Sequence, residues 1–377
     1  MSSFASMGAV IFTPALPEIA DYFHITDNLS QLTITLFLVG YALGQLIYGP
    51  LSNRFGRKKA FYIGIFISTI GSIVSILSEP LNSFTALILG RMLEALGSSA
   101  GLVISFTIVN DYYFPHSARK VISYMTLAFA VIPGIATFVG GTLVTHFHWI
   151  SCFYFLLLYG VLLAIPVHRL TETAQVLNKK ALHFATVRKN YICGFQNKLL
   201  RNTAIYFSLS TACIYAFSAS APLLAIHQLG ISAQSYGFIG LIPFIGTALG
   251  SIVSAQLSAK FSAWSLMRAG YVVEVITALI FAVLFTLGYV NLFVLIGSGF
   301  FFMFGACIVL SNGTSLASSQ FENKAIASAV TQFINVGMPV FGTLMLALTP
   351  QSIMKLPIAW LIGLTLMAVV SRFKRTA

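Results

Sequence analysis

Arg91 and Glu94 are the residues with the clearest capacity for chemistry, because both lie inside an apolar stretch at about 83–110. An arginine at the centre of a membrane helix costs roughly 2.5–3.5 kcal/mol on insertion scales, so it should face a partner or a wet cavity. Their separation of three residues places both side chains on one helix face. Two interpretations stay open: a self-neutralising structural pair, or a carboxylate that exchanges protons while Arg91 biases its affinity.

Other candidate residues lie in neighbouring apolar stretches. Residues on two stretches share helical spacing and could line an aromatic cavity for lipophilic compounds: Phe37, Tyr41 and Gln45 on one, Gln332 and Asn335 on the other. Core packing is the alternative role for each aromatic. Glu274 is a further buried acid, for which we expect packing or pairing with Arg268.

The elements that must position these residues are membrane helices. Apolar runs of about 20 residues predict a spanning helix each. We predict twelve spans, at approximately 1–19, 31–51, 60–78, 83–110, 119–144, 150–167, 203–226, 234–257, 266–287, 291–313, 325–348 and 357–371. The runs lack the alternation of a membrane β-barrel, so the predicted fold class is all-α.

The basic residues fix the predicted orientation. Of the 21 Lys and Arg residues, 19 fall in six windows that occupy every second connection between spans. These windows are 54–59, 119–120, 169–201, 260–268, 324 and 372–375. The positive-inside rule assigns them to the cytoplasm, which predicts a multi-pass bacterial inner-membrane protein with both termini cytoplasmic. The opposite connections carry Lys355 and four acids, Glu18, Asp21, Asp27 and Glu79.

Composition excludes several classes of protein. With 58% hydrophobic and 8% charged residues, the chain could not solvate the surface of a soluble globular domain. The net charge of +12 is explained by orientation charge facing an anionic leaflet, so no nucleic-acid partner is expected. The four cysteines are widely spaced and read as isolated thiols, and His146 and His148 lack a third ligand, so no metal is expected.

The two halves of the chain repeat. At a shift of 206 residues, Ala42-Leu43-Gly44 recurs as Ala248-Leu249-Gly250, and Pro133 falls on Pro339. We predict two parallel six-helix repeats, 1–168 and 203–377, joined by a cytoplasmic linker at 169–202. Six is even, so the repeats share orientation, with a site between them near mid-membrane and alternating access by rocking.

The connection between the second and third spans carries a dense motif, Gly49-Pro50-Leu51-Ser52-Asn53-Arg54-Phe55-Gly56-Arg57-Lys58-Lys59. Gly49 should let a neighbouring helix approach, and Gly56 suits a tight turn. The cations can pair with nearby acids such as Asp111. A generic basic loop is the alternative.

With this motif the sequence resembles the major facilitator superfamily, and most closely its Bcr/CflA-type drug:proton antiporters, over nearly the whole chain. Three further segments carry the resemblance: Thr13-Pro14-Ala15-Leu16-Pro17, Arg91-Met92-Leu93-Glu94-Ala95-Leu96-Gly97, and Pro133 with Gly140-Gly141. The resemblance implies a major facilitator fold and gating roles for Gly49, Asn53, Arg54, Gly56, Arg57, Asp111, Pro133, Gly140 and Gly141.

Four positions depart from the family's pattern. Asn53 stands for an Asp of the loop motif, Glu94 for a Gln, and Thr137 for a second proline. Val10 stands where the family carries the helix-one Asp that is expected to carry the proton. Only 13 residues precede Pro14, so either the first helix is short or the native start lies upstream.

The expected function is export of lipophilic drugs or small metabolites in exchange for protons, with Arg91 and Glu94 coupling the two. The expected partners are a small-molecule substrate, protons and the lipid bilayer, for a monomer that needs no cofactor beyond the proton gradient. An uncoupled facilitator is the alternative, because the helix-one acid is absent. A receptor or scaffold would need a larger soluble segment than 168–202, and an enzyme would need clustered catalytic groups.

Overall fold

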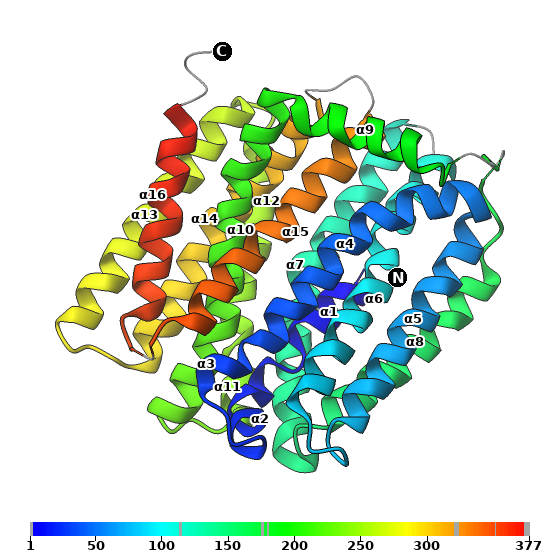
Figure 1. Cartoon of the computed structure of the whole chain (residues 1–377). Coiled ribbons are helices and arrows are strands. Elements are labelled where there is room, and N and C mark those ends of the chain that lie inside the picture. The colour runs from blue at the N-terminus through cyan, green and yellow to red at the C-terminus, as the bar shows by residue number, and fades with distance from the viewer. Residues whose placement is uncertain are drawn as a thin grey trace.

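The computed structural model describes residues 3–112, 115–174, 177–178, 181–319, 324–350 and 352–372. Every regular element within these ranges is a helix, as Figure 1 shows. The helices are α1 (Phe4–Val10), η1 (Thr13–Ala15), α2 (Leu16–Tyr22), α3 (Asp27–Ser30), α4 (Leu32–Phe55), α5 (Arg57–Leu77), α6 (Phe84–Tyr112), α7 (Pro115–Phe147), α8 (Ser151–Arg169), α9 (Phe184–Gln196), α10 (Lys198–Leu223), η2 (Leu224–Gln228), α11 (Ala233–Ile239), α12 (Leu241–Leu257), α13 (Ala263–Thr286), α14 (Leu292–Ser319), α15 (Lys324–Leu348) and α16 (Lys355–Arg372).

The long helices match the predicted spans. Within the described residues, nine helical segments are long and apolar enough to cross a membrane, and Val131–Phe147 and Lys355–Ser371 are shorter apolar helices. Their outer surfaces are rich in exposed apolar side chains such as Phe66, Leu158 and Phe293, as lipid contact requires. The all-α membrane fold predicted from the sequence is therefore confirmed.

The first span differs from the single helix that the sequence predicted, because it is broken. It consists of α1, η1 and α2, with the interruption at Ile11 and Phe12 and Pro14 inside η1. Proline has no backbone N–H and disfavours an α conformation at the residue before it, which accounts for the interruption. α1 begins at Phe4 beside α6, at mid-height in Figure 1.

Glycines let α4, α5 and α6 pack at very close range. A Cβ at Gly40 would lie 2.0 Å from the carbonyl oxygen of Met92, and one at Gly71 would lie 2.2 Å from the backbone nitrogen of Glu94. Small residues at such contacts are the usual device for close packing in membranes. α6 is thus held between α4 and α5 on both sides of the turn that carries Arg91 and Glu94.

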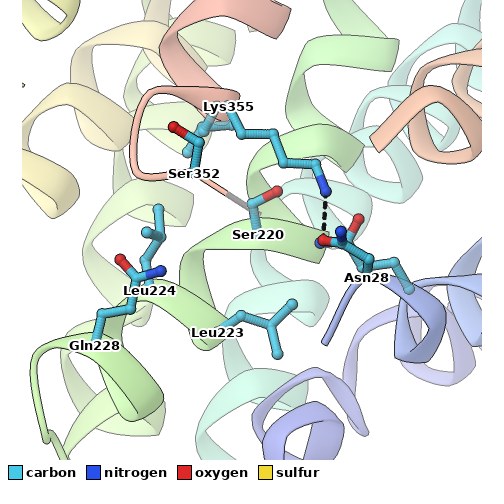
Figure 2. Close-up of a pocket in the computed structure, with 9 residues that line it drawn as sticks. Asn28, Ser220, Leu223, Leu224, Gln228, Ser352 and Lys355 are labelled. Carbon is cyan, nitrogen blue, oxygen red and sulfur yellow. Dashed lines mark hydrogen bonds between the residues drawn. The ribbon is translucent and has the colours of Figure 1, made fainter. Parts of the chain in front are cut away.

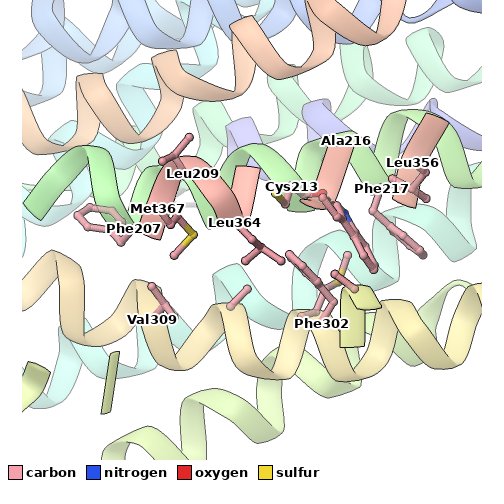
Figure 3. Packing of buried hydrophobic residues seen from close by; sticks show 14 of the residues in the cluster. Phe207, Leu209, Cys213, Ala216, Phe217, Phe302, Val309, Leu356, Leu364 and Met367 are labelled. Carbon is pink, nitrogen blue, oxygen red and sulfur yellow. Dashed lines mark hydrogen bonds between the residues drawn. The ribbon is translucent and has the colours of Figure 1, made fainter. Parts of the chain in front are cut away.

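The second half has a separate core that includes Trp360, and Figure 3 shows its members Phe302 and Leu364. The indole stacks on Phe302 with ring centroids 4.0 Å apart, and its N–H donates to the carbonyl oxygen of Cys213 at 3.0 Å. Trp360 is fully buried. This bond satisfies the indole's one donor, so the α16 side chain stabilises the core without an unpaired polar group.

We call the two ends of the molecule by their charge. The basic end carries the turn between α4 and α5, the helix α9 and the end of α16, which lie together at the top of Figure 1. The opposite end carries α2, α3, α11 and the start of α16. Among the predicted basic positions, Lys179, Lys180, Lys374 and Arg375 lie outside the described residues, as do the side chains of Arg119, Lys120, Lys324 and Arg372.

The described polar contacts between the two halves lie at the opposite end. Asn28 donates to the carbonyl oxygen of Thr349 at 2.6 Å, and the Thr35 hydroxyl donates to the Thr343 hydroxyl at 2.9 Å. Nδ1 of His227 lies 2.9 Å from an oxygen of Asp27. In this conformation the opposite end is closed.

At the basic end, the linker contains a helix that the sequence did not predict. α9 runs across that end from one half to the other in Figure 1. The hydroxyl of Tyr191 donates to the carbonyl oxygen of Leu46 in α4 at 3.0 Å. One turn later, Phe195 packs edge-on against Phe333 of α15. α9 therefore contacts both halves.

Candidate functional site

Arg91 and Glu94 form the buried ion pair that their spacing predicted. Nη1 of Arg91 lies 2.8 Å from Oε2 of Glu94, and the two side chains are 0% and 2% exposed. Nη2 donates to the backbone carbonyl oxygen of Gly8 at 2.7 Å. The guanidinium is thus bound by a charged and a neutral acceptor, which offsets part of the cost of burying it.

Aromatic rings enclose the guanidinium. Its Cζ lies 4.0 Å from the ring centroid of Phe12, 4.3 Å from that of Phe37 and 5.8 Å from that of Phe153. The negative faces of such rings attract a cation, most strongly where water is excluded. Phe12 and Phe153 belong to different segments of the first half, and no spacing rule in the sequence identifies them.

The break in the first span supplies acceptors to this site. Pro14 cannot donate to the carbonyl of Val10, which instead accepts from the Thr13 hydroxyl at 2.9 Å. Two residues earlier, the carbonyl of Gly8 accepts from Arg91. An interrupted helix in a membrane must have its freed backbone groups satisfied by neighbours, and here a threonine and an arginine do so.

Glu94 lies against the helix that lacks the family's acid. A Cβ at Gly8 would lie 2.9 Å from Oε1 of Glu94, so only glycine leaves this space for the carboxylate. Val10, which stands where the family carries Asp, is buried two residues further along α1. A carboxylate is therefore present beside the first span, but it comes from α6.

The residues predicted to line a substrate cavity are placed on α4 and α15. Phe37, Tyr41 and Gln45 are buried, and Phe37 and Tyr41 share an apolar cluster with Phe333 and Val336 of α15. Gln332 and Asn335 are half-buried. Asn335 donates to Oε1 of Gln332 at 3.5 Å, and its Oδ1 accepts from Thr211 of α10 at 2.6 Å. The two sets of side chains approach the same interface between the halves, but no described hydrogen bond joins them.

The loop motif forms a charged network at the basic end. Nε of Arg57 lies 2.9 Å from Oδ2 of Asp111, the pairing expected from the sequence, and its Nη1 donates to Oδ1 of Asn53 at 2.7 Å. Gly56 has φ +92, a conformation that side-chain-bearing residues rarely adopt, which confirms the predicted turn. Among the described contacts, Arg54 lies over the ring of Phe55 and forms no bond to this network.

We expected a helix backbone to approach Gly49 closely, and none of the described residues does so. The nearest atom to a Cβ placed there is the Tyr191 hydroxyl of α9, at 3.8 Å. The close helix approach on α4 occurs instead at Gly40 and at Gly44, whose Cβ would lie 1.8 Å from Oγ of Ser99. The motif glycine leaves room for the linker tyrosine, which sequence spacing could not reveal.

Glu172 of the linker is an acid of this turn that no motif in the sequence indicates. Its two carboxylate oxygens accept from the backbone N–H of Arg57 at 2.9 Å and of Lys58 at 3.1 Å, so it caps the start of α5. Burial alone would raise the pKa of Glu172, but these bonds and one from Ala174 outweigh it and lower the pKa below its ordinary value. Because Asn53 is neutral, Asp111 and Glu172 provide the negative charge of this turn.

Gly140 and Gly141 of α7 make close contacts with different halves. A Cβ at Gly140 would lie 1.7 Å from the carbonyl oxygen of Ile11, whereas one at Gly141 would lie 2.5 Å from that of Ala233 in the second half. Thr137, in place of a second proline, donates its hydroxyl to the carbonyl oxygen of Pro133 at 2.9 Å. Pro133 lies inside α7 without ending it.

Glu274 is buried, but no ion pair with Arg268 is found among the described contacts. Its Oε2 accepts from the Ser210 hydroxyl at 3.1 Å, and Oε1 has no hydrogen-bond partner among the described residues.

The four cysteines are free thiols. His148 contacts Glu18 at 3.1 Å, and the described residues contain no group of three or more His, Cys, Asp or Glu that could hold a metal ion.

Comparison with known proteins identifies relatives along the chain. The sequence is 26% identical over 292 residues to a Haemophilus influenzae protein named bicyclomycin resistance protein homolog, covering 77% of this chain and 73% of that protein. It is 25% identical over 348 residues to multidrug resistance protein D of Escherichia coli, covering 92% and 86%. A chloramphenicol resistance protein of Pseudomonas aeruginosa is 26% identical over 365 residues, covering 92% and 82%.

Solved structures share the fold. The crystal structure of a D-xylose-proton symporter matches with a TM-score of 0.76 at 14% identity, over 98% of this chain and 96% of that one. The inward open conformation of the xylose transporter XylE from E. coli matches with a TM-score of 0.74, over 99% and 95%. The family model of the Major Facilitator Superfamily, a family of transporters and not of enzymes, matches residues 1–370. The chain therefore belongs to the major facilitator superfamily.

Proposed function

We propose that the protein exports lipophilic drugs or small metabolites in exchange for protons, by alternating access of a site between its two halves. Relatives named for resistance to bicyclomycin, to chloramphenicol and to multiple drugs support this class of substrate. The division into bundles at 1–168 and 203–377 with a linker at 169–202 is part of this proposal, because alternating access requires two bodies that rock.

The observation that carries the proposal is the Arg91–Glu94 pair. Both charges are buried beside the broken first span, in the half of the chain that lacks the family's helix-one acid. A proton on Glu94 would remove its attraction for Arg91 and leave the guanidinium with the Gly8 carbonyl and the aromatic rings. The proton therefore changes which contacts are favourable at the junction of α1, α4 and α6. A conformational equilibrium responds to any ligand that binds its two states unequally, including a proton.

Charge supports the orientation. We propose a monomer in the bacterial inner membrane, with the basic end in the cytoplasm. The turn between α4 and α5 and the helix α9 both carry Lys and Arg and lie at that end, which supports this orientation. The closed opposite end then faces outward. A substrate would enter this conformation from the cytoplasmic side between the halves, past α9.

The test is substrate-driven proton movement in proteoliposomes, with bicyclomycin and chloramphenicol as substrates. We expect the wild-type protein to move protons against substrate, and Glu94→Gln to abolish this movement without lowering the protein level. Glu79→Gln, the same change in a half-exposed residue at the opposite end, is the matched control and should behave as the wild type. Unchanged proton movement in Glu94→Gln would remove Glu94 from the coupling.

A second candidate function is an uncoupled facilitator of a small metabolite, and Val10 is the observation that favours it. A buried valine cannot carry the proton that the family's helix-one acid carries. In the same vesicles, this function predicts that wild-type protein moves substrate down its gradient with no movement of protons.

A further inference from the structure

A histidine of the second half lies between two acids of the first half at the opposite end. His227 belongs to η2, which follows α10. Its Nδ1 lies 2.9 Å and 3.0 Å from the two carboxylate oxygens of Asp27, and its Nε2 lies 3.6 Å from Oδ2 of Asp21. Each ring nitrogen therefore faces a carboxylate across the boundary between the halves.

The charge of the ring decides how favourable these contacts are. A neutral imidazole has one N–H, which can donate to Asp27, and one bare nitrogen, which then faces Asp21. An imidazolium attracts both carboxylates, and its bond to Asp27 becomes charge-assisted and roughly twice as strong. Asp27 is the stronger partner because its side chain is 12% exposed, against 78% for Asp21, so solvent screens it less.

Lys355 adds a permanent positive charge to the same side of this contact. Its Nζ donates to Oδ1 of Asn28, the neighbour of Asp27 in the chain, at 2.6 Å (Figure 2). With His227 neutral, the second half brings one positive charge to the two carboxylates. With His227 protonated it brings two, and the charges of the two halves balance. The proton thus completes the electrostatic match between them.

We propose that His227, Asp21 and Asp27 form a proton-operated latch, in which a proton on His227 holds the opposite end closed and its loss favours opening. The histidine belongs to one half and both acids to the other, so separation of the halves at this end takes both partners away from the imidazolium. The proton therefore binds more tightly to the closed state and shifts the equilibrium toward it. Histidine ordinarily changes charge between pH 5 and 8, so the latch operates in that range.

The other ionisable groups around the latch do not account for such a response. α11 packs against η2 and brings Tyr236, and tyrosines keep their proton below pH 8. His24 is exposed on the connection between α2 and α3, and the described contacts of its side chain include none with a charged group. Lys355 keeps its positive charge at acidic pH. His227 is thus the group that changes charge between the halves.

A second histidine at the same end offers a comparison within one half. Nε2 of His148 lies 3.1 Å from Oε1 of Glu18, and its Nδ1 lies 3.8 Å from Oε1 of Glu79. His148 is therefore also placed between two acids, but all three residues belong to the first half. Separation of the halves leaves this group together, so a proton on His148 favours neither conformation.

The role of the latch in the cell rests on the proposed function and orientation. His227 then faces the exterior, apart from the Arg91–Glu94 pair buried in α6, so its proton regulates the cycle and does not cross the membrane. A proton taken up from an acidic exterior closes the outer end once the substrate has left. This step returns an exporter to the conformation that is open to the cytoplasm.

The experiment measures the distance between the halves at the opposite end as a function of pH. Spin labels replace Leu81 and Tyr289, which are exposed on the α5–α6 and α13–α14 connections, in the full chain without its native cysteines. Glu94→Gln is the starting protein, because it lacks the carboxylate that the proposed function assigns to coupling. We expect the ratio of short to long distances to be about fivefold higher at pH 5.5 than at pH 8.

Variants of His227 test whether this residue is the origin of the response. His227→Gln keeps a polar side chain that cannot be protonated, and it should abolish the dependence on pH. His227→Lys is positively charged throughout the range, so it should give the short distance at pH 8 as well as at pH 5.5. The matched controls are His148→Gln and His24→Gln, which should respond to pH as the starting protein does.

Two results would overturn the proposal: a ratio that stays constant between pH 5.5 and 8 while His227 is present, or an undiminished response in His227→Gln. The first needs no change at His227, so it decides the matter even if a variant does not fold. Proton movement in proteoliposomes that Glu94→Gln leaves unchanged would contradict the proposed coupling but not the latch. The two proposals can therefore fail separately.

Discussion

At the scale of single residues, the spacing of the Arg91–Glu94 pair is a local property of one helix, whereas its surroundings come from tertiary packing. Loss of one partner should therefore cost more stability than loss of both. We predict that Arg91→Met alone lowers the free energy of unfolding by about 3 kcal/mol, because Glu94 keeps a buried carboxylate without its partner. A spacing of three predicts the pair from the sequence, but the rings of Phe12 and Phe153 come from other segments, which no spacing rule identifies.

The double variant Arg91→Met/Glu94→Met should recover most of the stability lost in Arg91→Met, since apolar side chains of similar volume suit the aromatic surroundings. Unfolding in mixed micelles measures both. A double variant as unstable as Arg91→Met would show that the pair contributes little to the loss. Transport should be absent from both variants if the pair couples protons.

At the scale of elements, apolar run length located the long helices within a few residues, because a span is defined by its length and hydropathy. The break of the first span was harder to place. Pro14 was visible in the sequence, but its consequence depends on which neighbours accept the freed backbone groups. α9 was missed because its composition is polar, so hydropathy does not separate a surface helix from a loop.

Pro50 links α9 to α4 in a way that can be tested. Proline has no N–H to donate to the carbonyl of Leu46 four residues earlier, and the Tyr191 hydroxyl donates to that carbonyl instead. Burial raises the pKa of Tyr191 to about 12, so the hydroxyl keeps its proton at neutral pH. Tyr191→Phe should lower the free energy of unfolding by about 1 kcal/mol and speed proteolysis of the linker.

Denaturant unfolding and limited proteolysis measure these two effects. Tyr289→Phe, at an exposed tyrosine of the opposite end, is the matched control for loss of one hydroxyl. If Tyr191→Phe and the wild type were cleaved at the same rate, α9 would be held by apolar contacts such as Phe195 with Phe333.

At the scale of the whole molecule, the alternation of basic and acidic connections predicted which loops share an end, and the described basic connections lie at one end, as expected. The Lys and Arg residues that flank a membrane helix set its orientation, so this prediction needs no knowledge of how the helices pack. Which end is closed was not predictable. That property depends on a few contacts between halves, such as Asn28 with Thr349, whose partners are 321 residues apart.

Cys193 tests the orientation of the whole chain without an engineered label. Of the four free cysteines, Cys193 on α9 is the exposed one and the other three are buried. If the basic end is cytoplasmic, a membrane-impermeant maleimide should label inverted vesicles and leave intact spheroplasts unlabelled. Cys193→Ser should abolish the labelling of vesicles. Labelling in intact spheroplasts would place the basic end outside.

The glycines of α7 restrict how this protein can evolve. A Cβ at Gly140 would meet the carbonyl oxygen of Ile11, and one at Gly141 would meet that of Ala233, so any substitution at either position forces backbones apart. Selection by a new compound must therefore act elsewhere in the chain, and both positions should stay glycine in its descendants.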